Sequence, residues 1–400
     1  MKVVIIGGYG VFGSLTAQLL ARDGHQLWLA GRHPEKGRTA AQELGARTLK
    51  LDIHNAPEAL FDVKPDVVID AAGPFQHYGD DPYRVPRLCI AHGCNYLDLS
   101  DSATFTKGIN GLNTEATAAG VFALSGASSV PGLSSSIVDD LIEDLEEVDL
   151  IDIAILPGNR APRGISVIKS ILSGVGRPYQ VWRESTWQTA IGWTDRKAYE
   201  LEPDMMRIGY SVNVPDIALL PGRTGANSVM FRAGLELPVM NWALDFLARA
   251  RQYWRFELPE TAYSALYLLS KALYPFGSDR GGMQVRVSGD LNGQRVTRKW
   301  TLIAERGCGP FVPGVMCRAI LREHKNINAG ARPCLAELPR TLIENAMADL
   351  EIHTEVIELF EQGAADPMGG AQTSITSALP PMLRFDDKSS TSRRIYAKRG

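Results

Sequence analysis

The sequence is poor in cysteine, carries little excess charge of either sign and has no long uncharged apolar run. Five cysteines are scattered over 400 residues, which is typical of a reducing compartment and excludes a disulfide-stapled protein. The net charge of −3 gives no broad basic field, so we do not expect nucleic-acid binding. No run of about 18 uncharged apolar residues occurs, and no signal-peptide pattern follows Lys2. We therefore expect a cytoplasmic protein without a membrane-spanning helix.

The composition is that of an ordinary globular protein, with 45% apolar and 22% charged residues. A chain of this length exceeds the usual size of one hydrophobic core, so we expect two domains. The periodicity changes near residue 149, and small and polar residues accumulate after residue 365. We predict a first domain over residues 1–148, a second over residues 149–365 and a flexible C-terminal tail over residues 366–400.

The first domain alternates short apolar segments with helical ones. The apolar segments, typical of strands buried on both faces, lie at residues 3–6, 26–30, 47–51, 66–71, 95–99 and 121–125. Helical patterns between them lie at residues 14–23, 35–44, 83–92 and 105–119. This alternation predicts an α/β domain of the Rossmann type, with a doubly wound parallel sheet.

The second domain has a different pattern. Polar and apolar residues alternate at residues 151–155, 283–289 and 295–304, which predicts antiparallel strands with one covered face. Helical stretches lie at residues 240–255 and 261–274. We therefore predict a mixed α+β domain.

A glycine motif follows the first strand and opens the first helix. In Gly8-Tyr9-Gly10-Val11-Phe12-Gly13, Gly8 allows a tight turn, Gly10 lets the backbone approach a pyrophosphate, and Gly13 lets helix and strand pack closely. The helix start offers unpaired N–H groups to an anion. The motif predicts a dinucleotide site that includes Gly8, Gly10, Val11, Phe12 and Gly13.

The end of the second strand indicates which dinucleotide binds. An NAD site has an acidic residue there, whereas this chain has Arg32, a guanidinium that suits the 2′-phosphate of NADP. Lys36 and Arg38 add positive charge, and Glu35 opposes it. We therefore favour NADP over NAD.

Further residues at the ends of strands are candidates for the cofactor site. Asp52 follows the third strand, where it either meets the adenine amino group or caps a turn. Small residues after the fourth strand let the backbone pass close to the cofactor. The predicted nicotinamide neighbours are Ala72, Gly73, Pro74, Phe75, Ser125 and Gly126.

Several motifs resemble the saccharopine dehydrogenase-like family of NAD(P)-dependent oxidoreductases. They are GGYGVFG at residues 7–13, AGR at 30–32, AAGPFQHYG at 71–79, CIAHGCNYLDLSD at 89–101 and GASSVPGLSS at 126–135. The resemblance is specific over the first 140 residues and looser beyond residue 150. It implies a Rossmann domain, a second domain whose sheet helps to form a homodimer, and a cleft between them.

The resemblance implies an oxidoreductase but leaves its small-molecule substrate open. Relatives include reductases that form secondary amines from imines, polyamine-forming enzymes and lipid enoyl reductases. We favour hydride transfer between NADP(H) and an imine or secondary amine of an amino acid or polyamine. The alternatives are a lipid enoyl reductase at a membrane and a non-catalytic dinucleotide sensor.

Hydride transfer needs a proton donor or acceptor near the carboxyl ends of the strands. His77 and Tyr78 follow the fourth strand, and His77 is either an acid–base group or a hydrogen-bonded loop residue. Asp101 lies just past the fifth strand, where it orients a substrate or caps the next helix. These three residues are the catalytic candidates.

Other side chains are candidates for substrate, membrane or metal binding. Arg160 and Arg163 lie in one Gly/Pro turn and could clamp a carboxylate, as could Arg280 in a second turn. The apolar segment at residues 237–254 belongs to the core, lines a wide cleft or touches a membrane. The cluster of Cys89, His92 and Cys94 lacks a fourth ligand, so we expect no metal site.

Overall fold

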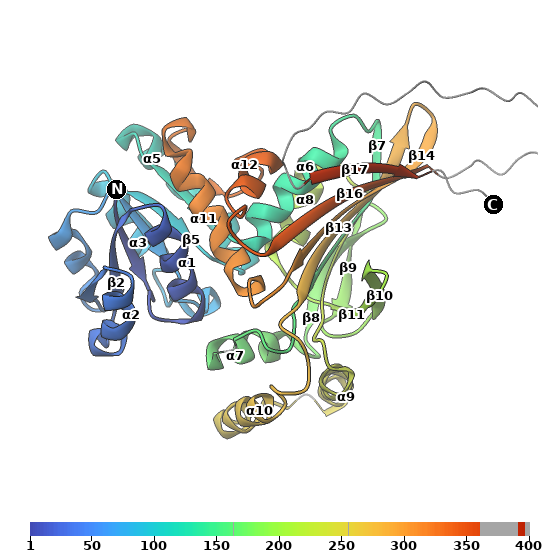
Figure 1. Ribbon diagram of the computed structural model, residues 1–400, viewed down its shortest axis with the longest axis horizontal. Helices are drawn as coiled ribbons and strands as arrows, with labels where there is room; N and C mark the ends of the chain where they lie inside the picture. Colours follow the sequence, from blue (N-terminus) through green and yellow to red (C-terminus); the bar gives the residue numbers. More distant parts are fainter. Residues whose placement is uncertain (163, 255, 361–390, 397–400) are drawn as a thin grey trace, which may run out of the picture.

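The computed structural model describes residues 1–162, 164–254, 256–360 and 391–396. Two β-sheets dominate these residues, one in each half of the molecule (Figure 1). Most of the first sheet is drawn in blue, and helices lie on both of its faces. The second sheet is larger, and its helices α7, α9 and α10 lie together at the lower end of the view.

The first domain is a seven-stranded sheet in the order β15-β6-β5-β4-β1-β2-β3, and every pairing in it is parallel. Its strands are β1 Lys2–Ile6, β2 Gln26–Gly31, β3 Arg47–Lys50, β4 Val67–Asp70, β5 Asn95–Asp98, β6 Phe122–Ser125 and β15 Gly330–Pro333. Its helices are α1 Val11–Arg22, α2 Arg38–Glu43, α3 Arg84–Ala91, α4 Ala103–Gly108, α5 Asn113–Ala119, α11 Val312–Arg322 and α12 Arg340–Asn345. Helix α6 Ser134–Ile142 packs against the second sheet. The predicted Rossmann fold is confirmed.

The chain returns to this sheet late in the sequence. The predicted boundaries placed residues 149–365 in the second domain, but β15 pairs with β6, and α11 (orange in Figure 1) packs against α1. Arg318 of α11 donates to Asp23 at 2.7 Å. This return covers the edge of β6, a buried strand whose backbone groups would otherwise lack partners. The boundary is therefore corrected.

The second sheet runs in the order β10-β11-β12-β7-β13-β14-β16-β17, with the β8–β9 hairpin attached to β12. Its strands are β7 Glu147–Leu156, β8 Pro178–Arg183, β9 Thr186–Ile191, β10 Lys197–Glu202, β11 Met205–Ser211, β12 Ser228–Ala233, β13 Gly281–Leu291, β14 Gln294–Ala304, β16 Ile352–Phe360 and β17 Thr391–Tyr396. Its helices are α7 Ile165–Gly174, α8 Pro215–Thr224, α9 Pro238–Trp254 and α10 Glu260–Ala272. The predicted antiparallel strands are confirmed in β7, β13 and β14.

The predicted flexible tail lies mostly outside the described residues. Residues 391–396 differ from that prediction, because they form β17 and pair in parallel with β16. The pairing supplies partners for the outer edge of β16. Within the described ranges, no helix combines the length and the apolar character needed to cross a membrane.

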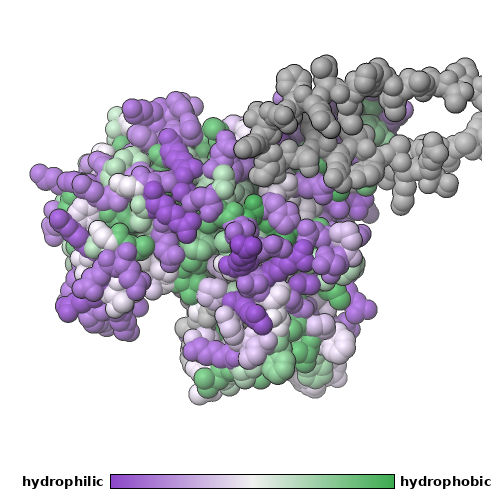
Figure 2. All heavy atoms as spheres, in the orientation of Figure 1, coloured by the Kyte–Doolittle hydropathy of each residue, from purple (hydrophilic) through white to green (hydrophobic). Residues whose placement is uncertain are grey.

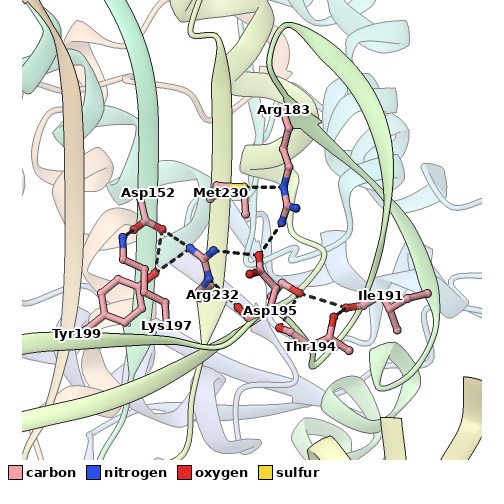
Figure 3. Close-up of polar contacts among 10 residues, drawn as sticks. Asp152, Arg183, Ile191, Thr194, Asp195, Lys197, Tyr199, Met230 and Arg232 are labelled. Atoms are coloured by element: carbon pink, nitrogen blue, oxygen red, sulfur yellow. Dashed lines mark hydrogen bonds and ion pairs between the residues drawn. The ribbon is translucent and has the colours of Figure 1, made fainter. Parts of the chain in front are cut away.

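A polar network fastens the outer strands of the second sheet (Figure 3). The carboxylate of Asp152 on β7 is 1% exposed and accepts hydrogen bonds from Arg232 at 2.8 Å and Tyr199 at 2.9 Å. Lys197 of β10 also pairs with it. Arg232 reaches on to Asp195 at 3.0 Å. The network therefore ties β10 to β7 and β12 through buried charge.

Candidate functional site

A cleft of about 830 Å³ lies between the two domains. Its first wall is formed by the glycine loop and by the segments that follow β2, β3, β4 and β5. Its second wall consists of α7 and the inner ends of β7, β13 and β14. The carboxyl ends of parallel strands are the usual place for ligands in such sheets, so this cleft is the candidate active site.

The glycine loop follows β1 and borders the cleft. Gly10, Val11 and Phe12 line the cleft, and α1 begins at Val11. A Cβ atom on Gly13 would come within 2.3 Å of Gly7 O, and one on Gly8 within 2.8 Å of Ile5 O. Gly8 and Gly13 therefore serve close packing behind the loop. The loop leaves space and free N–H groups where a pyrophosphate would lie.

The basic residues after β2 also reach the cleft. Arg32 and Lys36 are exposed, line the cleft and make no ion pair with any described residue. Glu35 pairs instead with His33 at 3.3 Å. The positive charge of Arg32 and Lys36 is therefore available to an anion, as an adenosine 2′-phosphate would require.

Asp52 lines the cleft, but its carboxylate is engaged in a turn. It accepts the His54 N–H at 3.0 Å and the Asn55 side-chain amide at 2.8 Å. The Asn55 hydrogen bond is the main cause that lowers the pKa of Asp52. The turn-capping alternative is therefore present in the structure, at the edge of the predicted adenine site.

The predicted nicotinamide neighbours divide into two groups. Ala72, Gly73, Pro74 and Phe75 line the cleft. The structure places Ser125 and Gly126 differently, because both are buried and donate to Asp98 at 2.9 and 2.8 Å. The residues that reach the cleft from this segment are Ser128, Ser129 and Val130. The contact between this segment and the cleft therefore lies a few residues after the end of β6.

Two buried aspartates stand beneath the cleft at the ends of β4 and β5. Burial raises the pKa of Asp70 to about 6 and that of Asp98 to about 7, against opposing hydrogen bonds from neutral donors. Asp98 Oδ1 takes three such bonds, while its Oδ2 has no partner among the described residues. These acids are therefore held in an environment that favours their neutral form.

Tyr78 lines the cleft and lies against Asp70. Its hydroxyl donates to the Asp70 carboxylate at 2.9 Å, and its ring stacks on Phe75 with centroids 4.9 Å apart. Burial raises the pKa of Tyr78 well above its ordinary value. The hydroxyl thus orients the loop through Asp70. The side chain of His77, the other candidate beside it, lies outside the described part of the structure.

Asp101 reaches across the cleft to the second domain. Its carboxylate accepts the Ser170 hydroxyl of α7 at 3.1 Å and the Gln76 amide at 3.2 Å. The N-cap of α4 is Ser102, which accepts the Phe105 N–H, so Asp101 does not cap that helix. Its exposed carboxylate lines the cleft, held between these two donors.

Arg160 and Arg280, two of the arginines considered for a carboxylate clamp, lie in the described part of the second domain. Arg160 lies outside the cleft and lines a separate pocket with Tyr274 and Pro275. Arg163 lies outside the described residues. Arg280 is bound to several acids, including Asp204 at 3.1 Å. The second-domain turns therefore contribute backbone and small residues to the cleft.

Within the described ranges, no group of three or more His, Cys, Asp or Glu side chains is placed to hold a metal ion. Cys89 and Cys94 are buried, and the ring of His92 stacks on Phe61 with centroids 3.9 Å apart. This packing explains the cluster that was visible in the sequence.

Sequence reasoning missed several cleft residues. The second wall includes Gly158, Gly281, Gly282 and Met283, which come from distant strands. No local pattern marks them, because their position follows from how the domains pack. Tyr9 was also missed, although it stands inside the glycine motif. Its size, unusual in such a loop, was the available signal.

The glycine loop, the parallel sheet and the cleft define a dinucleotide-binding α/β protein of the Rossmann type. Residues 3–124 match the family described as "Saccharopine dehydrogenase NADP binding domain". The first domain therefore matches the NADP-binding domain of saccharopine dehydrogenases, which confirms the resemblance seen in the motifs. No curated protein matches the chain.

Two solved structures show the same two-domain fold. Apo saccharopine dehydrogenase (L-Glu forming) from Saccharomyces cerevisiae is 14% identical with a TM-score of 0.62, covering 88% of this chain and 99% of that chain. Homospermidine synthase from Legionella pneumophila in complex with NAD is 13% identical with a TM-score of 0.55, covering 88% of this chain and 90% of that chain. At these identities the likeness concerns the fold.

Proposed function

We propose that the protein is an NADP(H)-dependent oxidoreductase that transfers a hydride to or from an imine or secondary amine of an amino acid or polyamine. The family match supports NADP binding, and the free charges of Arg32 and Lys36 support a 2′-phosphate. Saccharopine and homospermidine, named in the two similar structures, are both secondary amines. Their chemistry supports the same class of substrate here.

The observation that carries the proposal is the charge polarity of the cleft. At the nucleotide end, the cations Arg32 and Lys36 outnumber the carboxylate of Asp52, which is bonded within its own turn, whereas Asp101 and Asp279 stand nearer the second domain. Asp279 is exposed and makes no ion pair with a described residue. A basic end suits the phosphates of a dinucleotide, and an acidic end suits a protonated amine.

The chain would place both reactants at one point. When bound, the nicotinamide nucleotide supplies or accepts the hydride. The glycine loop binds the pyrophosphate, and the small residues at 72–74 let a ring lie close to the backbone. Asp101 would hold the substrate nitrogen by its charge, and its contact with Ser170 keeps both walls in register. The protein thus contributes mainly position.

The first test is a fluorescence titration of the purified chain with NADPH and NADH. We expect NADPH to bind more tightly. The variant Arg32→Met should raise the Kd for NADPH at least about tenfold, because a charge-assisted contact is lost. Arg38→Met is the matched control, because Arg38 does not line the cleft. An unchanged Kd in Arg32→Met would contradict the assigned 2′-phosphate site.

The second test follows NADPH oxidation with a panel of keto acids and aldehydes mixed with amines. We expect turnover with an amine-containing mixture, and a rise in KM when Asp101→Asn removes the negative charge. Tight NADPH binding without turnover of any imine, keto acid or enoyl compound would favour a dinucleotide sensor and contradict the proposal.

A second candidate, a lipid enoyl reductase at a membrane surface, is favoured by one observation. Large apolar side chains are exposed on α9 and α10, among them Trp242 at 63% and Phe246 at 72% (Figure 2, lower end). The others on and beside these helices are Val239, Tyr253, Trp254, Phe256, Leu268, Leu269, Tyr274 and Phe276. Such aromatic surfaces are typical of interfacial contacts.

Flotation with anionic phospholipid vesicles tests this candidate. The unmodified chain should float, and the double variant Trp242→Ser/Phe246→Ser should not. Trp187→Ser is the control, because Trp187 is 50% exposed on β9, away from these helices. A chain that stays unbound, or a dimer that requires Trp242 and Phe246, would contradict the membrane candidate.

A further inference from the structure

Tyr9, the second residue of the glycine motif, lies across the carboxyl end of β2. A Cβ atom on Gly31 would come within 2.2 Å of the Tyr9 hydroxyl oxygen, and one on Gly37 within 2.7 Å of its Cδ1. Gly31 and Gly37 do not have a positive φ, so their backbone conformation does not require glycine. Both glycines therefore provide space for the ring of Tyr9.

The position of this ring bears on the choice of nucleotide. Gly31 is the last residue of β2, near the place where NAD-binding Rossmann domains carry the acidic residue that holds the ribose 2′-hydroxyl. A side chain at residue 31 would overlap the hydroxyl of Tyr9. A carboxylate at residue 31 would therefore require the ring of Tyr9 to move from this position.

The hydroxyl of Tyr9 has a proton to donate. It accepts the His33 N–H at 3.0 Å and makes no other hydrogen bond to a described residue. Tyr9, Arg32 and Lys36 line the same cleft. A donor beside two cations suits a phosphate, which only accepts hydrogen bonds, better than a neutral ribose hydroxyl.

We propose that Tyr9 selects NADP(H) by donating its hydroxyl proton to the 2′-phosphate that Arg32 and Lys36 attract. This inference rests on the proposed function and adds a specificity-determining residue to it. A hydrogen bond to a charged acceptor is about twice as strong as one to a neutral acceptor. Loss of the hydroxyl therefore weakens NADPH binding more than NADH binding.

The variant Tyr9→Phe tests this, because it removes the hydroxyl and keeps the ring. In fluorescence titrations of the full chain, the Kd for NADPH should rise about tenfold and that for NADH by about threefold at most. Titrations with 2′,5′-ADP and 5′-AMP should show the same ratio. Tyr83→Phe is the matched control, because the Tyr83 hydroxyl donates to the Phe105 carbonyl at 2.8 Å and does not line the cleft.

The outcomes separate this inference from the function on which it rests. An unmodified chain that binds neither nucleotide contradicts the proposed function. An unmodified chain that prefers NADPH, with Tyr9→Phe losing affinity equally for both nucleotides or for neither, overturns the role of Tyr9 alone. A selective loss for NADPH, with Tyr83→Phe unchanged, supports it.

Discussion

The two domains bury aspartates in their sheets but neutralise them differently. In the first domain, Asp70 and Asp98 are fully buried and accept hydrogen bonds from neutral donors. In the second domain, Asp152 is equally buried and is paired with Lys197 and Arg232 (Figure 3). The first arrangement favours a protonated carboxyl, and the second a fixed ion pair.

This difference matches what the charged residues do in each domain. The cations around Asp152 hold strands of the second sheet together, so they are not available to a ligand. In the first domain, Arg32 and Lys36 stand at the cleft without an ion pair to a described residue. The acids below that cleft are buried with raised pKa values, so they add less negative charge near an anionic cofactor.

The largest expected effect comes from breaking the ion-pair network. Asp152→Asn leaves Arg232 and Lys197 beside a neutral amide, and we expect the free energy of unfolding to fall by about 3–5 kcal/mol. Urea unfolding measures this. Asp195→Asn, at a side chain 42% exposed, is the control and should lose about 1 kcal/mol or less. If both variants lose the same small free energy of unfolding, the ion pairs of Asp152 do not stabilise the sheet.

An aspartate-to-asparagine substitution at Asp98 should raise the free energy of unfolding at alkaline pH, whereas the one at Asp152 lowers it. Its pKa is raised from 3.8 to about 7, so the folded protein retains a proton that the unfolded chain releases between these values. Stability should therefore fall as the pH rises through this window. Asp98→Asn cannot ionise and should be more stable than the unmodified protein by on the order of 2–4 kcal/mol at about pH 8.

Thermal and urea unfolding at several pH values check the prediction for Asp98. The exposed residue Asp62 supplies the control, because Asp62→Asn should leave the pH dependence unchanged. If Asp98→Asn keeps the slope of the unmodified protein, the raised pKa of Asp98 does not govern stability.

The smallest expected effect concerns Tyr78. Tyr78→Phe removes a hydrogen bond that favours the ionised form of Asp70, so the pKa of Asp70 should rise further above about 6. Stability should fall by about 1 kcal/mol at about pH 8 and by less at about pH 5, where Asp70 is protonated. Tyr83→Phe loses a bond to a backbone carbonyl, so its effect should not depend on pH. A pH-independent loss in Tyr78→Phe would contradict this coupling.

Much of the first domain could be predicted because its signals are local. The apolar segments correspond to β1 to β6, and the glycine motif follows β1 and includes the start of α1. The residues after β4 reach the cleft as expected. Ser125 and Gly126 do not line the cleft, because they are bonded to Asp98, and the next residues of this segment to line it are Ser128, Ser129 and Val130. Periodicity indicates a strand but locates its exposed end only within a few residues.

The sequence by itself determined the class of this protein, because strand periodicity and a glycine loop act through neighbouring residues. Tertiary structure alone decided the return of β15 to the first sheet, the approach of Asp101 to Ser170 and the place of Tyr9 over Gly31. Each of these joins residues far apart in the chain. Such contacts depend on how whole elements pack, so the periodicity of a short segment cannot predict them.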